Sequence, residues 1–379
     1  MKRSVGAVLA LICIACADQT ETSGYQPPTD IDQRILALME EHQAKTVGIG
    51  IIRDHELVWT AYYGEQSEGV PAGPDTLFNT ASVNKSITAE TALRLASKDL
   101  IDLDEPISAY YVHPDLEGDP HHELLTPRIL LSHQAGFLNW PWLYEDGRLA
   151  FVEDPGNGSY NYSGIGFRIF ASFLEAKLEK PFPQIVREEV FDPIGMETAT
   201  NFHNDPWIME ILARPVDEEA RYLTDYTLEE DYWSAADDLF VTVEDHAAFL
   251  ISTMKNEAVS EVLATERIRV QTNMATNDIW RCGEDAVDPC PDPYGHGIGW
   301  FVFGDEEGLT VHHGGNDQSE GAIGYYNPAT GNGGVVFINS TQGVLMWPKV
   351  VDLVDPDQTF QDVFHDVIAR FLTPEEGGE

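Results

Sequence analysis

The chain has 379 residues, of which 43% are hydrophobic and 10% aromatic, a composition typical of a globular protein with a sizeable core. It carries 64 Asp and Glu residues against 22 Lys and Arg residues, which gives a formal net charge of −42. So acidic a surface repels phosphate backbones and anionic head groups, which argues against nucleic acid and negatively charged membranes as partners.

The first residues have the features of an export signal. Residues 1–3 contain the basic Lys2 and Arg3, and the run from Val5 to Ala15 is apolar but too short to cross a bilayer as a mature helix. The polar residues that follow, with two prolines, are typical of a tether. We therefore expect a signal peptide over 1–15, a tether over 16–29 and an exported protein of the periplasm or cell envelope.

Cys16 raises the alternative of a lipid anchor. It precedes an abruptly polar segment, an arrangement similar to the lipid-attachment box of bacterial lipoproteins. Cys13, however, stands where that box usually has Leu. The sequence leaves two alternatives open: a lipid on Cys16, or plain cleavage near Ala15 or Ala17.

Helix and strand patterns follow the tether. The apolar spacing of residues 33–43 predicts a helix. Residues 47–52 and 57–63 are rich in β-branched and aromatic side chains on either side of Asp54-His55, which predicts a hairpin. Residues 82–105 contain neither Gly nor Pro, so a long helix is expected to begin near Ser82.

The rest of the chain divides into a helical block and a second group of strands. Helical segments broken by Pro and Gly occupy 106–231, followed by strands and a last helix. If the two ends pair into one sheet around the helical insertion, the fold is α/β, with residues 30–81 and 232–375 forming the α/β part and 82–231 the helical part. The later elements are predicted as strands over 295–303, 321–326 and 334–339 and a helix over 362–372.

The cysteines indicate a disulfide and not a metal site. Cys282 and Cys290 lie close together in a Pro- and Asp-rich stretch, and a local disulfide is expected in an oxidising compartment. No further Cys or His residues cluster beside them as a metal site would need. The sequence also has no zinc-peptidase, phosphate-loop or dinucleotide motif, so neither a metal nor a cofactor is expected.

The first chemical signal is the pattern Ser82-Val83-Asn84-Lys85 at the expected helix start. A spacing of three places the hydroxyl and the amine on one helix face. A serine hydroxyl becomes a good nucleophile when a neighbouring base takes its proton. The pattern alone is weak evidence, because an ordinary exposed helix start contains it by chance.

The surrounding residues strengthen this signal. Residues 74–88 resemble the nucleophile segment of the class C β-lactamase and penicillin-binding esterase family. The similarity extends over about residues 33–370, and its ordered series is far more specific than any one motif. Further segments that resemble the family, in family order, are 100–107, 125–136, 155–167, 191–196, 294–300 and 311–315.

The resemblance implies a β-lactamase/transpeptidase-like fold, an antiparallel sheet flanked by helices with an inserted mostly helical subdomain. It also implies a serine hydrolase domain over 30–375 that acts through an acyl-Ser82 intermediate. Tyr162 would act as general base or share a proton with Lys85, with Tyr160 as a less well-spaced rival. The family's Tyr-x-Asn triplet reads Tyr162-Ser163-Gly164 here, so the amide that usually helps to bind substrate is absent.

The third family element is an edge strand that lines the site, usually Lys-Thr-Gly or His-x-Gly. Both His312 and His313 precede Gly314-Gly315, and adjacent strand residues face opposite ways, so only one can face the site. The distance to Tyr326-Asn327-Pro328 favours His313. A backbone N–H of Gly315 or Asn316, together with that of Ser82, would form the oxyanion hole.

The expected function is hydrolysis of an ester or amide of a small molecule or peptide, by an esterase or peptidase. The alternatives are a D-Ala or D-amino-acid peptidase, a β-lactamase, and a non-catalytic penicillin-recognising binding protein. His133, His246 and His296 are expected to be structural. Asp237-Asp238 falls where the family tends to have Gly-Gly, which leaves the adjoining wall of the site open.

Overall fold

The computed structural model describes residues 25–203, 207–277, 279–283, 290–305, 308–356 and 360–372. The predicted signal peptide, Cys16 and residues 373–379 therefore lie outside the described residues. The last residues of the predicted tether are packed onto the domain, because the Tyr25 hydroxyl donates to the Val354 carbonyl at 2.7 Å and its ring lies 6.0 Å from that of Trp59.

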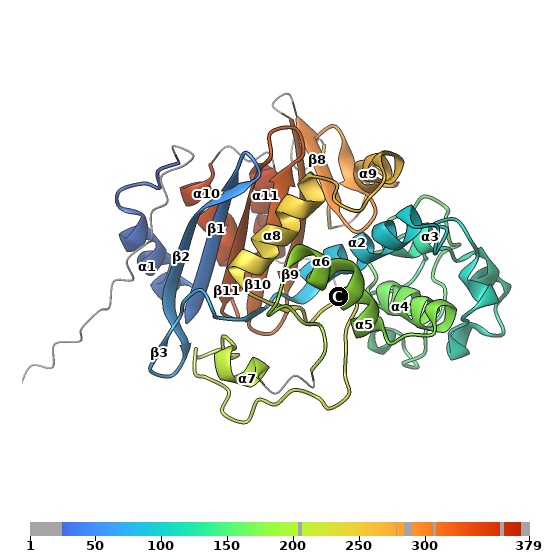
Figure 1. The fold of residues 1–379 in the computed structure, drawn as a ribbon, viewed down its shortest axis with the longest axis horizontal. Helices are drawn as coiled ribbons and strands as arrows, with labels where there is room; N and C mark the ends of the chain where they lie inside the picture. The colour runs from blue at the N-terminus through green and yellow to red at the C-terminus, as the bar shows by residue number, and fades with distance from the viewer. Residues whose placement is uncertain are drawn as a thin grey trace, which may run out of the picture.

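One large sheet dominates the described part of the chain (Figure 1). It has nine antiparallel strands in the order β3-β2-β1-β11-β10-β9-β8-β7-β6. The predicted meeting of the two chain ends is confirmed, since β1 pairs with β11 from Thr46↔Asn339 onward. The strands are β1 (Thr46–Arg53), β2 (Glu56–Ser67), β3 (Val70–Pro71), β6 (Thr272–Asn273), β7 (Tyr294–His296), β8 (Phe301–Asp305), β9 (Gly308–Asn316), β10 (Glu320–Asn327) and β11 (Asn332–Asn339), with β4 (Phe78–Asn79) and β5 (Phe240–Val241) in a separate two-stranded sheet.

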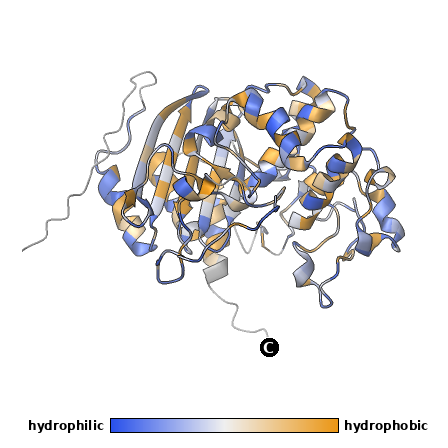
Figure 2. Cartoon of the chain, turned by 60° about the horizontal axis from the view of Figure 1, so that its bottom comes forward, coloured by the Kyte–Doolittle hydropathy of each residue, from blue (hydrophilic) through white to orange (hydrophobic). Residues whose placement is uncertain are grey.

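Helices cover both faces of the sheet and form the inserted block beside it. In Figure 1, α8 lies in front of the sheet and α10 and α11 lie behind it. In Figure 2 the helices carry hydrophilic and hydrophobic residues next to one another, as helices with one buried face do. The α-helices are α1 (Ile31–Glu41), α2 (Asn84–Ser97), α3 (Pro127–Leu131), α4 (Gly164–Leu178), α5 (Phe182–Val186), α6 (Asp192–Ile194), α7 (Ile208–Ile211), α8 (Val243–Met254), α9 (Glu261–Ile268), α10 (Gly343–Val354) and α11 (Phe360–Leu372).

Two large apolar cores follow from this layering. Behind the sheet, buried residues of β1, β10 and β11 pack against α1, α10 and α11, with Ile35, Trp347 and Phe360 among them. The larger core joins the other face of the sheet to α8 and the helical block. Helix α8 can approach β1 closely because Gly48 and Gly50 have no side chain. A Cβ atom at these positions would lie 2.7 or 2.8 Å from Val243.

The long helix predicted to begin near Ser82 is confirmed, although it does not continue through the whole stretch without Gly or Pro that ends at residue 105. The chain makes a 3₁₀ turn over Ala81–Val83, then α2, which ends at Ser97. The end comes early because Asp99 adopts a left-handed conformation with φ of 57° and the Leu100 amide turns back to the Leu95 carbonyl at 3.0 Å.

The strand predicted over 295–303, with its Gly-rich approach, is present as two strands instead of one. Strands β7 and β8 pair antiparallel with each other, and residues 297–300 form the turn between them. Two glycines allow the turn to pack tightly. A Cβ atom at Gly297 would lie 2.2 Å from the Arg267 carbonyl oxygen, and one at Gly299, whose φ is 74°, would lie 2.1 Å from Ala89 Cβ.

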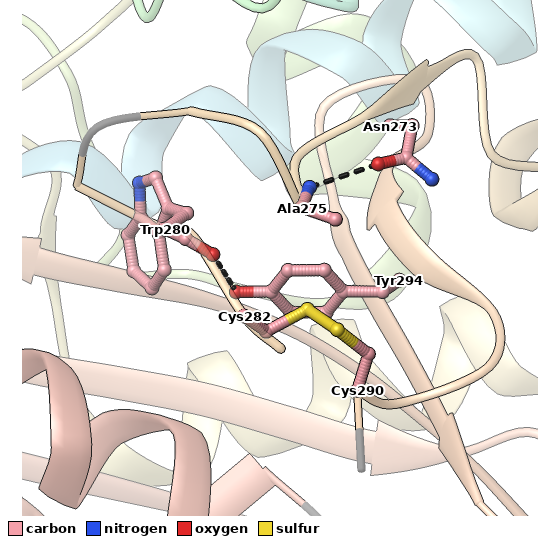
Figure 3. The surroundings of a disulfide bond; sticks show 6 residues. All are labelled: Asn273, Ala275, Trp280, Cys282, Cys290 and Tyr294. Carbon is pink, nitrogen blue, oxygen red and sulfur yellow. Dashed lines mark hydrogen bonds between the residues drawn. A yellow bond between two sulfur atoms is a disulfide. The ribbon is translucent and has the colours of Figure 1, made fainter. Parts of the chain in front are cut away.

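The predicted disulfide is present, and Cys282 and Cys290 are joined (Figure 3). Beside it, the Tyr294 hydroxyl donates a hydrogen bond of 2.6 Å to the Trp280 carbonyl.

Within the described residues, no helix has the length and apolar character required to cross a membrane.

Candidate active site

Ser82 lies at the centre of the candidate site, in the turn directly before α2. The residue before it, Ala81, has a φ of 46°, an uncommon conformation for a residue with a side chain. This turn is held by two hydrogen bonds: the Ala81 amide donates to Asn79 Oδ1 at 3.2 Å, and the Thr80 amide donates to the Leu239 carbonyl at 2.9 Å. The turn therefore presents a partly exposed Ser82 in a fixed orientation.

Lys85 is the hydrogen-bond partner of this serine. Its side chain is buried, and Nζ donates to Ser82 Oγ at 3.0 Å and to the Ala236 carbonyl at 2.7 Å. The spacing of three residues brings the amine and the hydroxyl together as the sequence predicted. A 3.0 Å contact is short enough for the amine to exchange a proton with the hydroxyl.

Tyr162 completes this group from the segment that precedes α4. Lys85 Nζ lies 4.8 Å from the centroid of its ring. The rival Tyr160 packs instead in the core behind the sheet, with its ring 6.5 Å from that of Phe301. The structure therefore brings Ser82, Lys85 and Tyr162 together.

His133 positions Tyr162. The two ring centroids lie 4.4 Å apart, and the buried Nδ1 atom of His133 accepts a hydrogen bond of 2.9 Å from the Ser163 amide. Burial, and then the charges of nearby groups including Lys85, hold the pKa of His133 well below 6.5, so the ring is neutral. The sequence predicted a structural role for His133 but did not predict its contact with Tyr162.

The free segment of β9 lies beside the serine. Pairing with β8 stops at Phe301↔His312, whereas pairing with β10 continues to Asn316↔Gly321. Residues 313–316 thus have no strand partner on the β8 side within the described part of the chain. The prediction of an edge strand is wrong for β9 as a whole, which is interior to the sheet, because β8 is too short to cover its end.

Gly315 brings β9 into contact with the nucleophile turn. A Cβ atom there would lie 2.0 Å from the Thr80 carbonyl oxygen and 3.1 Å from the Ser82 amide nitrogen. The strand backbone therefore passes directly against the turn. Asn316, the next residue, is exposed at the end of the strand.

The structure places His313 on the face of β9 toward the site, with its ring centroid 6.5 Å from that of Tyr162. Its Nδ1 atom lies 2.7 Å from the Gly314 carbonyl, which can only accept, so Nδ1 carries the proton and Nε2 is left as an acceptor. Burial, and then the charge of Lys85, hold the pKa of His313 well below 6.5, so the ring is neutral.

His312 points the other way, into the core behind the sheet. Its ring centroid lies 5.2 Å from those of Phe301 and Phe360, and neither ring nitrogen has a hydrogen-bond partner within the described residues. Burial lowers the pKa of His312 to about 3, so this ring also stays neutral in the folded protein.

The buried His312 is expected to make the folded state sensitive to acid. Between its unfolded pKa of 6.5 and its folded pKa of about 3, the unfolded chain binds a proton that the folded chain does not. Stability is therefore lost as the pH falls, by about 2 kcal/mol from pH 7 to pH 5 for this group. In His312→Phe, the loss between those pH values, measured by urea unfolding, should be smaller by that amount. The exposed His365, changed to Gln, serves as the control, and an equal change in both variants would contradict the prediction.

Four carboxyl groups flank the site from two loops. Asp237 and Asp238 lie on the segment that Asn84 ties to α2, since Asn84 Nδ2 donates to the Asp237 carbonyl at 2.7 Å. Asp238 Oδ1 accepts from Asn79 Nδ2 at 2.8 Å. Asp317 and Glu320 lie at the turn between β9 and β10. The wall of the site beside Asp237 and Asp238, whose character the sequence did not predict, is therefore acidic.

Three of these carboxyl groups have raised pKa values, and for Asp317 the main cause is burial. Burial, together with the negative charge of Asp238, raises the pKa of Asp237. Burial, together with the charge of Asp317, raises the pKa of Glu320 to about 8. Glu320 is thus protonated at neutral pH.

Within the described residues, no group of three or more His, Cys, Asp or Glu side chains is arranged to hold a metal ion.

A family model and a curated relative are similar to this chain. The family model described as Beta-lactamase matches residues 31–350. A D-aminopeptidase of Gluconobacter oxydans is 24% identical over 312 residues, which are 75% of this chain and 54% of the relative. The chain thus spans about half the length of that relative.

Solved structures share the fold. An octameric penicillin-binding protein homologue from Pyrococcus abyssi superimposes with a TM-score of 0.71 at 18% identity, covering 92% of this chain and 82% of its own. The D-amino acid amidase from Ochrobactrum anthropi SV3, complexed with L-phenylalanine amide, superimposes with a TM-score of 0.64 at 19% identity, covering 91% of this chain and 100% of its own.

Proposed function

This chain belongs to the β-lactamase family, and on that premise we propose that it is a serine hydrolase that cleaves an ester or amide through an acyl-Ser82 intermediate. The single observation that carries the proposal is the 3.0 Å hydrogen bond between the buried Lys85 Nζ and Ser82 Oγ, in the turn before α2. A buried amine bonded to a partly exposed hydroxyl is the arrangement that activates a serine.

In the first step, Lys85 or Tyr162 takes the proton of Ser82 Oγ, and the oxygen attacks the substrate carbonyl carbon. The negative charge that develops on the carbonyl oxygen would be stabilised by the Ser82 amide and an amide of the Gly315–Asn316 segment, which passes beside it. When the tetrahedral intermediate collapses, the base returns the proton to the leaving alcohol or amine, which departs and leaves acyl-Ser82.

In the second step, water attacks the acyl carbon. The same base takes a proton from the water and returns it to Ser82 Oγ, so the acid is released and the enzyme is regenerated. His313 is neutral and offers Nε2 as an acceptor, which suits it to orient the substrate or the base rather than to add a positive charge.

An esterase or peptidase is favoured over an efficient β-lactamase. Gly164 stands in the place of the substrate-binding amide, and the acidic residues Asp237, Asp238 and Asp317 do not attract a carboxylated antibiotic. The similarity to a D-aminopeptidase supports a D-amino-acid peptidase as the second candidate. A non-catalytic binding protein with the same fold is the remaining alternative.

A fluorescent alkyl phosphonate probe tests the proposal directly. We expect one adduct per chain on the wild-type protein, mapped by peptide mass spectrometry to Ser82, and no adduct on Ser82→Ala. The wild type should also hydrolyse at least one of three substrates: a short acyl p-nitrophenyl ester, a D-Ala-D-Ala peptide or a chromogenic cephalosporin. Equal labelling of both proteins, or an absence of label and hydrolysis in a folded wild type, would favour the binding protein.

The localisation follows from the first residues. We propose export, supported by the basic residues Lys2 and Arg3 and the apolar run from Val5 to Ala15. Incorporation of a labelled fatty acid into the wild type but not into Cys16→Ala would distinguish a lipid anchor from plain cleavage.

A further inference from the structure

The neighbourhood of Gly164 contains an aromatic surface that the proposed mechanism does not use. A Cβ atom at Gly164 would lie 2.5 Å from Cζ2 and 2.6 Å from Cη2 of Trp140. No side chain therefore fits at position 164, two residues after Tyr162, unless the indole moves. The Trp140 ring fills the space that a side chain at this position would take.

The loop that carries Trp140 is fixed to the start of α4. Asn139 Oδ1 accepts a hydrogen bond of 2.7 Å from the Gly164 amide, and the Asn139 carbonyl accepts one of 3.0 Å from the Ile165 amide. The Tyr144 hydroxyl accepts from the Leu138 amide at 2.8 Å, which closes the loop on itself. The indole is thus held against the same turn that presents Tyr162.

A second indole extends this surface outward. The rings of Trp140 and Trp142 are stacked, with centroids 5.1 Å apart and planes inclined by 14°. Trp142 remains 70% exposed and Leu143 54% exposed. One face of Trp142 stacks on Trp140 and most of the rest of its ring is exposed to water, so core packing does not explain its position. Exposed apolar surface beside a site commonly binds a ligand.

We propose that Trp140 and Trp142 form the wall of the site that receives an apolar, aromatic acyl group of the substrate. The proposal rests on the proposed serine hydrolase function and names the substrate class for that site. Two features commit it to this occupant. The surface is continuous with the turn of Tyr162, because Trp140 lies against Gly164, and flat stacked indoles match a planar ring.

The test compares two esters that differ by one phenyl ring, p-nitrophenyl acetate and p-nitrophenyl phenylacetate, on the full-length protein. We expect the wild type to prefer the phenylacetyl ester. In Trp142→Ala the ratio of the two kcat/KM values should fall about tenfold, a loss equivalent to about 1.4 kcal/mol. Because Trp142 is mostly exposed, this variant is expected to fold.

A second variant and a control make the outcome specific. Gly164→Ala keeps both indoles but forces the Trp140 ring to move, so the same ratio should fall. Val262→Ala on α9, whose side chain is 73% exposed, removes apolar surface elsewhere and should leave the ratio within twofold.

The proposal is overturned if the wild type hydrolyses both esters and Trp142→Ala keeps the wild-type ratio. Absence of hydrolysis of either ester by the wild type, or equal rates in Ser82→Ala, is instead a failure of the proposed serine hydrolase function.

Discussion

Replacing Lys85 by methionine is expected to lower kcat for ester hydrolysis about 10³-fold while the protein stays folded. Lys85 Nζ is the group that hydrogen-bonds Ser82 Oγ, at 3.0 Å, and it is held there by the Ala236 carbonyl at 2.7 Å. Methionine can occupy the same buried position, but its side chain cannot take a proton. The loss should appear in kcat and equally in the rate of phosphonate labelling, because both require an activated Ser82.

Lys177→Met on α4 is the matched control for this experiment. It removes the same charge from a lysine that pairs with Glu105 and lies over the ring of Tyr110, within the helical block. Its kcat should stay within about twofold of wild type. A similar fall in both variants would point to a general effect of charge, and a normal kcat in Lys85→Met would assign the base to Tyr162 alone. Thermal unfolding of both variants checks that the fold is retained.

The parts of the fold that sequence patterns predicted are those governed by neighbours in the chain. The hairpin of β1 and β2 forms around Asp54 and His55, whose positive φ values of 50° and 64° suit a tight two-residue turn. The contact of Ser82 with Lys85 follows from one turn of helix geometry. These features need no knowledge of the rest of the molecule.

The parts that could not be predicted depend on distant residues. Asp238 reaches the nucleophile turn by its contact with Asn79, 159 residues away. The space for a side chain at position 164 is taken by Trp140, from a different loop. The turn between β7 and β8 packs against Arg267 and Ala89, which are distant in the sequence. The side chains of residues 295–303 suit a strand, so the local sequence predicted a strand there and gave no sign of the turn.

Gly315→Ala is expected to lower kcat/KM for ester hydrolysis by about 10²- to 10³-fold, the cost of losing an aligned oxyanion donor. The added methyl group would lie 2.0 Å from the Thr80 carbonyl oxygen, a backbone atom that cannot rotate away. Either β9 or the nucleophile turn must therefore move, and the strand amides would no longer stand beside the Ser82 amide.

The adjacent glycine supplies the control for this loss. In Gly314→Ala the methyl group would lie 3.6 Å from the Ala322 carbonyl oxygen, an ordinary contact, so kcat/KM should change by less than about threefold. The comparison is made by steady-state kinetics and by binding of a boronic acid, which forms a tetrahedral adduct on Ser82 and should bind Gly315→Ala more weakly by a similar factor. Two variants with the same activity would mean that the passage of β9 against the nucleophile turn is not required, and the oxyanion hole would have to be sought at other amides.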